Sequence, residues 1–415
     1  MNNKNFINRD KPSIVGLEFI LIYIALILYT INFMGMGDFI PLFLFPYILL
    51  SITKVSFNKS FLLIVGLLIS FSLLYSLAIY YYNFASPLSI LGKLIYPIMF
   101  LLLGYNIVSL KYDMKYKIIR HFLLIFIISL SSYGIISLIN TLQIYGNIEG
   151  VFSALGGRVA VDFWNGNLIS ATSLNSFLSL GLALLPILFL SVKKNEVSLF
   201  MKLLVMIVFT LSLYASLQVS SRTGVLIIGV SIIFHLFYIE KLTKRKVRRF
   251  TYFIISIGAL IFLYSLNFFN IKSEITNSYI YERLVTTDLR NDSRINAWGE
   301  AFNGLFTYPL GGREATLSLN YAHNIWLDIG YDTGIIPTIL FVILSFLVTV
   351  ELIKFIRTDH PILLKSLVLC MSSAFLVIFL LEPVLQGLGV YFTIFCFLIG
   401  AVTKVNHLSK SKNIC

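Results

Sequence analysis

The chain has 415 residues, of which 58% are hydrophobic and only 12% are charged, and its mean hydropathy is +0.88. This composition excludes a soluble globular enzyme and indicates a membrane protein, because apolar runs of about 18 or more residues recur from end to end. The net charge of +13 could suit a nucleic-acid-binding protein, but most of the charges flank apolar runs, which excludes that class as well.

About twelve membrane-spanning helices are predicted, so the expected fold is an all-α polytopic membrane protein with a single transmembrane domain over residues 1–415. No small-residue cleavage site follows the first apolar run, which we expect to be an uncleaved helix. The second run is short and contains Pro41 and Pro46. The predicted spans are 13–34, 39–53, 60–82, 90–110, 118–140, 168–192, 200–219, 224–240, 250–270, 322–350, 362–382 and 388–403.

The distribution of basic residues predicts the orientation of these spans. With both termini in the cytoplasm, the inner loops hold 24 of the 32 Lys and Arg residues, as the positive-inside rule requires. The densest group runs from Lys241 to Arg249 and is expected to anchor the chain at the lipid headgroups. Residues 271–321 are then a large extracytoplasmic loop between the ninth and tenth spans.

Six arginines remain on the predicted outer side, where topology requires no cation. His323 is the only histidine there, since the other four lie at or near the cytoplasmic side. Guanidinium groups are always charged and form bidentate hydrogen bonds with phosphate, so this surface favours an anion; snorkelling to lipid headgroups is the structural alternative. The six are Arg158, Arg222, Arg283, Arg290, Arg294 and Arg313.

Two short outer segments precede the large loop. The first, 144–167, contains Arg158, Asp162 and Trp164. The second is a tight turn over 220–224 that carries Arg222 between two apolar spans. An arginine at that depth is costly unless it is paired or faces a polar cavity. We therefore interpret Arg222 as part of the anion site.

In the large loop, Arg290, Arg294 and Trp298 follow one another at intervals of four residues. A helix would place all three on one face. That face would suit either an anion or, as the alternative, a helix that lies on the membrane surface with tryptophan at the interface.

His323 is expected to begin the tenth helix, with Gly330 and Gly334 on one stripe that admits a neighbouring helix or a lipid chain. Histidine is the usual general base near neutral pH, and a capping or structural role is the alternative. If His323 is not the base, the role passes to Asp328 or Glu300, which we take as the nearest carboxylates.

Four short motifs occur in order on the predicted outer side. They are GGRVAVDFWNGN at 156–167, SRTG at 221–224, Arg294 with Trp298 and YPLGG at 308–312, and HN at 323–324 followed by Gly334 and PT at 337–338. Together they resemble the motifs of the O-antigen ligase and repeat-unit polymerase family, which includes capsular and exopolysaccharide polymerases. Gly166 departs from the pattern, because a proline is expected there.

The resemblance implies a glycosyltransferase of the bacterial cytoplasmic membrane that uses glycans linked to undecaprenyl diphosphate on the outer face, works without metal or cofactor, and inverts the anomeric carbon. Preorganised arginines would stabilise charge on the departing diphosphate. We predict His323, Arg222 and Arg294 as catalytic residues. The predicted substrate-binding residues are Arg158, Arg283, Arg290, Asn324 and Trp298. A flippase and a chain-length regulator are the expected partners, besides the lipid bilayer.

Other functions stay open at this point. A polysaccharide flippase or another transporter has a similar length, but transporters usually place polar groups near the bilayer midplane, whereas Lys93 and Glu382 lie near span ends and are interpreted as interfacial. Within the enzyme class, ligation to lipid A core is the alternative to polymerisation. The sequence contains no phosphate-binding loop and no metal motif, and its three cysteines have no disulfide or metal spacing.

Overall fold

The computed structural model describes residues 15–53, 55–109, 115–146, 148–155, 158–190, 198–239 and 293–412. Within these ranges the chain is almost entirely helical, and eight helical segments are long and apolar enough to cross a membrane, which confirms the predicted all-α membrane fold. These are α3 (Lys59–Tyr81), α4 (Pro87–Ser109), α5 (Lys115–Tyr145), α7 with α8 (Ala171–Leu182 and Leu185–Phe189), α9 (Leu199–Gln218), α16 (Ile335–Arg357), α17 (Ile362–Leu381) and α19 (Gly389–Lys412).

Three more predicted spans are shorter apolar helices. They are α1 (Val15–Thr30), the pair η2 (Gly37–Leu44) and α2 (Phe45–Ile52), and α10 (Arg222–Tyr238). The second predicted span is thus a 3₁₀ turn that contains Pro41, followed by a two-turn helix. The ninth predicted span, 250–270, lies outside the described residues. The number of crossings therefore stays a prediction.

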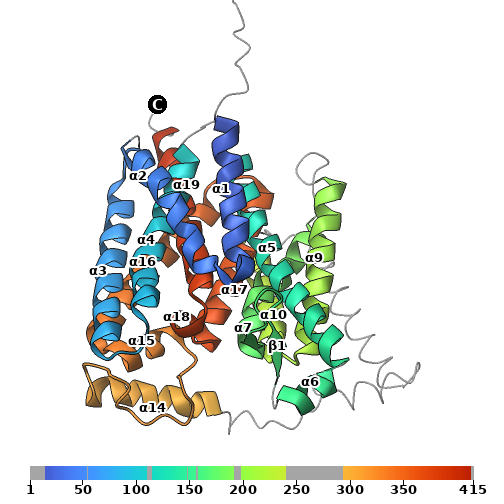
Figure 1. The fold of residues 1–415 in the computed structure, drawn as a ribbon. Coiled ribbons are helices and arrows are strands. Elements are labelled where there is room, and N and C mark those ends of the chain that lie inside the picture. The colour runs from blue at the N-terminus through green and yellow to red at the C-terminus, as the bar shows by residue number, and fades with distance from the viewer. Residues whose placement is uncertain are drawn as a thin grey trace, which may run out of the picture.

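The helices stand side by side, and their packing is closest between α4 and α19 (Figure 1). A Cβ atom at Gly104 would lie 2.1 Å from the carbonyl oxygen of Phe397, and one at Gly400 would lie 2.1 Å from that of Leu101. Small residues at such a contact allow two backbones to touch, which is the usual way of joining helices that share an apolar surrounding. Both described ends of the chain lie at one end of this bundle.

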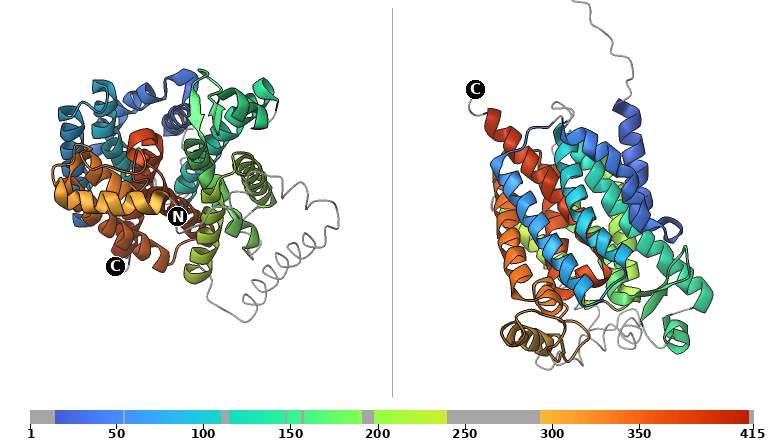
Figure 2. Two further views of the ribbon diagram at one scale, coloured as in Figure 1. Left: turned by 90° about the horizontal axis from the view of Figure 1, so that it is seen from below. Right: turned by 60° about the vertical axis from the view of Figure 1, so that its left-hand side comes forward.

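The other end of the bundle is covered by α14 (Ser293–Thr307), which lies across the ends of the long helices (Figures 1 and 2). Its buried face consists of Ala297, Ala301 and Leu305, spaced by four residues as a helix requires. We call this end of the molecule the α14 end. The described part of the predicted large loop, 293–321, therefore contains an ordered helix that packs on α15 (Ile325–Thr333).

The tenth predicted span, 322–350, is two helices, because the chain breaks between α15 and α16 at Gly334. Gly334 has a φ of 88°, and a Cβ there would lie 2.2 Å from the carbonyl oxygen of Pro309. A Cβ at Gly330 would lie 2.1 Å from a methyl of Leu305 on α14. The prediction that both glycines lie on one helix was wrong, because Gly334 ends α15. The expected approach of a neighbouring helix is found at Gly330, which admits α14, while Gly334 admits the backbone of 309–310.

A small antiparallel hairpin also lies at the α14 end. Strand β1 (Val159–Val161) pairs with β2 (Leu168–Ser170), which begins where the sixth span was predicted to begin. The Asp162 carboxylate accepts hydrogen bonds from the Tyr133 hydroxyl at 2.6 Å and from the Trp164 amide at 2.7 Å, which fixes the turn. Gly166 in this turn has a φ of 72°, a value that proline cannot adopt, which accounts for its departure from the motif.

Cysteine labelling tests the predicted orientation. With Cys415 replaced by serine and the buried Cys370 and Cys396 retained, a cysteine at the exposed Ser293 should react with an impermeant maleimide in intact cells. A cysteine at Ser198, an exposed serine that starts a helix in a predicted inner loop, should react only after the membrane is opened. The reverse pattern would contradict the orientation.

Candidate functional site

Three arginines from distant parts of the sequence meet in one small cleft at the α14 end. They are among the predicted site residues: Arg158 before the hairpin, Arg222 at the start of α10, and Arg294 at the start of α14. The residues that line the cleft are Arg158, Ala171, Thr172, Ser221, Arg222, Thr223, Arg294 and Glu382.

The hairpin and the first turn of α10 place the first two arginines. Arg158 Nη1 donates to the carbonyl oxygens of Val219 at 3.4 Å and Ser220 at 3.2 Å, so it holds the chain that leads into α10. Ser220 has a φ of 51°, which turns the backbone sharply, and Arg222 is then the first residue of α10. The helix thus begins two residues earlier than predicted, and Arg222 belongs to its first turn instead of a loop.

Arg294 reaches the cleft from the opposite side, as the second residue of α14. Its Nη2 lies 3.5 Å from Glu382 Oε1, and the Thr223 hydroxyl is 3.4 Å from the same oxygen. The cleft therefore joins α10, α14 and the end of α17 through one carboxylate.

Glu382 is the residue that the sequence analysis missed. Interpreted there as an interfacial charge, it is only 1% exposed and lies among the arginines. Pro383 follows it, so α17 ends here and the carboxylate turns into the cleft from a helix end. The signal that could have found it is a carboxylate directly before a proline at the end of an apolar span on the predicted outer side.

Positive charges outnumber negative charges among the described residues that line the cleft. Three guanidinium groups and one carboxylate are found among the described residues that line it. Burial, together with the neighbouring charges of Arg222 and Arg294, lowers the pKa of Arg158. Like charges held this close repel one another and favour an anion that would neutralise them. The geometry therefore suits a phosphate or a diphosphate.

His323 adjoins the cleft through the same carboxylate. Its Nδ1 lies 3.7 Å from Glu382 Oε2, and neither atom has a hydrogen-bond partner among the described residues. His323 has a φ of 56°, an uncommon conformation for a residue with a side chain. Backbone strain of this kind is typical of functional sites, where the surrounding structure holds it in place.

Asp328 supplies that support. Its carboxylate accepts the backbone N–H of Ala322 at 2.7 Å and of Asn324 at 3.1 Å, on both sides of His323. Asn324 begins α15, and its side-chain oxygen accepts the amides of Trp326 and Leu327. Burial raises the pKa of Asp328 to about 7. The loop that carries His323 is therefore fixed from two directions.

Asp328 and Glu300, the alternative bases named from the sequence, are not the carboxylates nearest to the imidazole of His323. Asp328 is engaged with the two backbone amides, and Glu300 Oε2 accepts the amide of Ser318 at 2.5 Å. Glu382 is the carboxylate that the structure places beside the imidazole. The expectation that Asp328 or Glu300 was nearest is therefore corrected.

The remaining predicted site residues are dispersed. Trp298 lies one turn after Arg294 on α14 and has a buried indole N–H without a partner among the described residues. Arg283 and Arg290 lie outside the described residues. Asn324 caps α15, as described above. Arg313, another outer arginine, forms an ion pair of 2.7 Å with Asp332 and is structural.

No group of three or more His, Cys, Asp or Glu side chains gathers in the part of the chain that the structure describes. Comparison of the sequence with protein-family models and with curated proteins finds no match. We therefore base a functional proposal on the geometry of the cleft and on the four motifs.

Proposed function

We propose that the protein is a glycosyltransferase of the bacterial cytoplasmic membrane that polymerises oligosaccharide repeat units carried on undecaprenyl diphosphate at the outer face. The observation that carries this proposal is the convergence of Arg158, Arg222 and Arg294 on one cleft, where Glu382 is the one carboxylate among the described lining residues. Arginine side chains of this arrangement can contact both phosphates of a diphosphate at once. Transfer of the glycan to lipid A core uses the same chemistry and is the alternative.

The chemistry requires charge stabilisation at the leaving group. The acceptor oxygen forms a bond to the anomeric carbon, the bond from that carbon to the diphosphate oxygen breaks, and the electron pair stays on the diphosphate. Direct attack inverts the anomeric centre. Arg222 and Arg294 would stabilise the growing negative charge in a partly dry cleft, where fixed charges act more strongly than in water. Arg158 would support them and hold the start of α10.

The acceptor hydroxyl must also lose its proton. In this proposal His323 takes it, because its imidazole adjoins the arginine cleft. Nδ1 faces Glu382, so Nε2 is the nitrogen that would meet the hydroxyl. Glu382 would orient the imidazole and stabilise the imidazolium that forms, as a buried carboxylate does for a catalytic histidine in hydrolases.

A reconstituted assay tests the function. Purified protein given repeat units linked to undecaprenyl diphosphate should release undecaprenyl diphosphate and form longer glycans, and EDTA should not reduce the rate. A flippase would move the lipid-linked glycan across vesicles without lengthening it. Movement of the lipid-linked glycan without any new glycosidic bond would contradict the proposal. A requirement for lipid A core as the acceptor would contradict polymerisation.

A further inference from the structure

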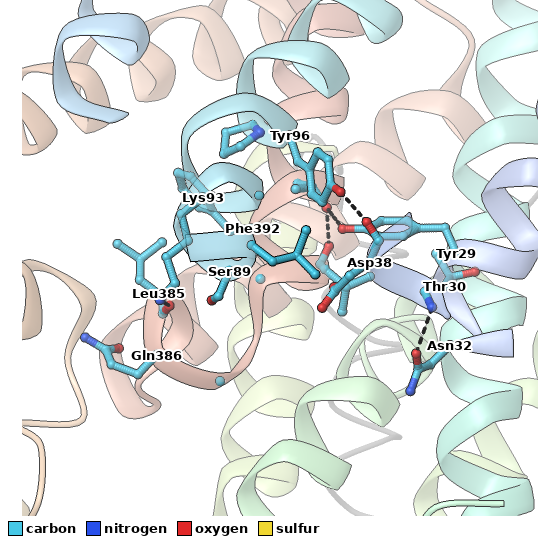
Figure 3. Close-up of a pocket in the computed structure, with 18 of the residues that line it drawn as sticks. Tyr29, Thr30, Asn32, Asp38, Ser89, Lys93, Tyr96, Leu385, Gln386 and Phe392 are labelled. Atoms are coloured by element: carbon cyan, nitrogen blue, oxygen red, sulfur yellow. Dashed lines mark hydrogen bonds between the residues drawn. The ribbon is translucent and has the colours of Figure 1, made fainter. Parts of the chain in front are cut away.

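A second and larger cavity lies in the same half of the bundle. Its volume is about 330 Å³, at the lower end of the range for ligand pockets in proteins. Figure 3 shows Lys93, Ser89 and Tyr96 of α4 on one side, with Asp38, Tyr29 and Asn32 of the α1–η2 segment on the other. Leu88 and Ser89 at the start of α4 are exposed, so the cavity opens to the surface there.

The walls of this cavity are aromatic and rich in hydroxyl and amide groups. Seven aromatic side chains line it, and four of them are tyrosines. Several polar groups are already held in place: the Tyr29 hydroxyl bonds Thr393 Oγ1 at 2.7 Å, and the Tyr75 hydroxyl donates to Asp332 at 3.2 Å. The side-chain oxygen of Gln386 is buried and has no hydrogen-bond partner among the described residues. A buried acceptor of this kind favours a ligand that brings a donor.

The charge of the cavity is balanced, in contrast to the arginine cleft. Lys93 and Asp38 are the charged side chains that line it. Lys93 Nζ donates to the carbonyl oxygen of Leu385 at 2.5 Å, which uses one of its three donors. An anion would find no excess of positive charge here. A polyprenyl chain would leave the side-chain oxygen of Gln386 and the two remaining donors of Lys93 without partners. The lining instead suits a neutral ligand with apolar C–H faces and many hydroxyl groups.

We infer that this cavity binds the glycan that accepts the transferred repeat unit. The inference rests on the proposed function and adds the second substrate site that a transfer reaction requires. Two elements connect the cavity with the arginine cleft. The segment around α18 (Val384–Gly387) supplies Glu382 to the cleft and Gln386 to the cavity, and α7 supplies Thr172 to the cleft and Phe177 to the cavity.

Blocking the mouth of the cavity tests this assignment. Ser89 is exposed, and its hydroxyl has no partner among the described residues, so Ser89→Trp should fill the cavity without disturbing the core. Leu91→Trp is the matched control, because Leu91 is 45% exposed on the same helix and does not line the cavity. The probe is an oligosaccharide of several repeats from the surface polysaccharide of the producing bacterium, freed of lipid and phosphate.

Ser89→Trp should weaken binding of this oligosaccharide at least tenfold, while Leu91→Trp should bind it as the wild type does. Both variants should bind undecaprenyl diphosphate without sugar at wild-type affinity, which also shows that they are folded. Equal oligosaccharide affinity in the two variants would overturn the inference. So would a loss of undecaprenyl diphosphate binding in Ser89→Trp, since the cavity would then hold the lipid chain.

Competition separates the cavity from the arginine cleft. The oligosaccharide should still bind in the presence of saturating undecaprenyl diphosphate without sugar. Mutual exclusion would place the oligosaccharide in the cleft and overturn the assignment. The proposed function fails separately, if the wild type does not bind undecaprenyl diphosphate or if Arg222→Ala binds it unchanged. In either case the oligosaccharide comparison still decides what the cavity holds.

Discussion

Replacing Arg222 with alanine should lower the rate of glycosyl transfer by about 10²-fold or more, the usual effect of removing one preorganised group that stabilises transition-state charge. Membrane insertion and the amount of folded protein should not change, because the side chain lies in the first turn of α10 and faces the cleft. The measurement is turnover of lipid-linked repeat units by purified protein, with binding of undecaprenyl diphosphate measured in parallel.

Replacing Arg222 with lysine distinguishes the effect of the positive charge from the effect of the guanidinium geometry. Arg222→Lys keeps the positive charge but loses the planar group that can contact two phosphate oxygens together. We therefore expect it to recover only a small part of the activity that alanine loses. Recovery close to the wild-type rate would show that the cleft needs a positive charge alone, and it would contradict bidentate recognition of the diphosphate.

Arg294→Ala should also abolish most of the transfer, but its effect has two parts. The guanidinium contacts the buried Glu382 carboxylate at 3.5 Å, so its removal leaves that carboxylate with one charged neighbour fewer. Some loss of stability is expected together with the loss of transfer. The double variant Arg294→Ala, Glu382→Gln should recover the stability and not the transfer.

Basic residues away from the cleft provide the control variants. Arg357→Ala removes an exposed arginine in the last turn of α16, and it should keep the wild-type rate. Lys244→Ala and Arg248→Ala should be tolerated as well, since their predicted role is topological and is shared among six cations. Wild-type turnover by both Arg222→Ala and Arg294→Ala would remove the anion-binding role from the cleft.

The sequence predicts the helical architecture well, because spans depend on local hydrophobicity and the bilayer fixes their length. Three of the six arginines that it singles out also meet in the cleft. The positive-inside rule accounts for most cations, and three of the remaining arginines meet in the structure although up to 136 residues separate them in the chain. Position relative to the membrane was therefore the useful signal.

What the sequence could not predict depends on contacts between distant segments. Hydropathy gives no sign that the tenth span breaks at Gly334, because the break is imposed by the backbone of 309–310 packing against it. Glu382 has the sequence context of an interfacial carboxylate, and its contact with Arg294 depends on the approach of another helix. The larger cavity likewise draws its walls from α1, η2, α3, α4, α5, α7, α18 and α19, which no motif connects.

The second large effect is expected at His323. If the imidazole accepts the proton of the acceptor hydroxyl, removing it should lower the turnover number by about 10²–10⁴-fold. Binding of undecaprenyl diphosphate should change little. Asparagine is the better replacement for this test, because His323 has a φ of 56°, which asparagine adopts more readily than alanine. His323→Ala should show the same kinetic loss with an additional loss of stability.

His323→Lys distinguishes the base from a second anion contact. A protonated histidine that binds the diphosphate could be replaced by lysine with part of the activity kept, and its removal would weaken donor binding. A histidine that acts as general base could not be replaced by lysine in this way, since lysine is protonated near neutral pH. Turnover near the wild-type rate in His323→Lys would contradict the base assignment, and Glu382 would then be the carboxylate nearest to the vacated position.

Glu382→Gln completes the test, because the two roles of the carboxylate predict different kinetics. The substitution keeps the shape of the side chain and removes the only negative charge among the described residues that line the cleft. The affinity for undecaprenyl diphosphate should therefore stay equal or increase. The turnover number should fall, since the imidazolium formed at His323 would lose its stabilising neighbour at 3.7 Å. A purely structural glutamate would lower the folded fraction and leave the turnover number of the folded protein unchanged.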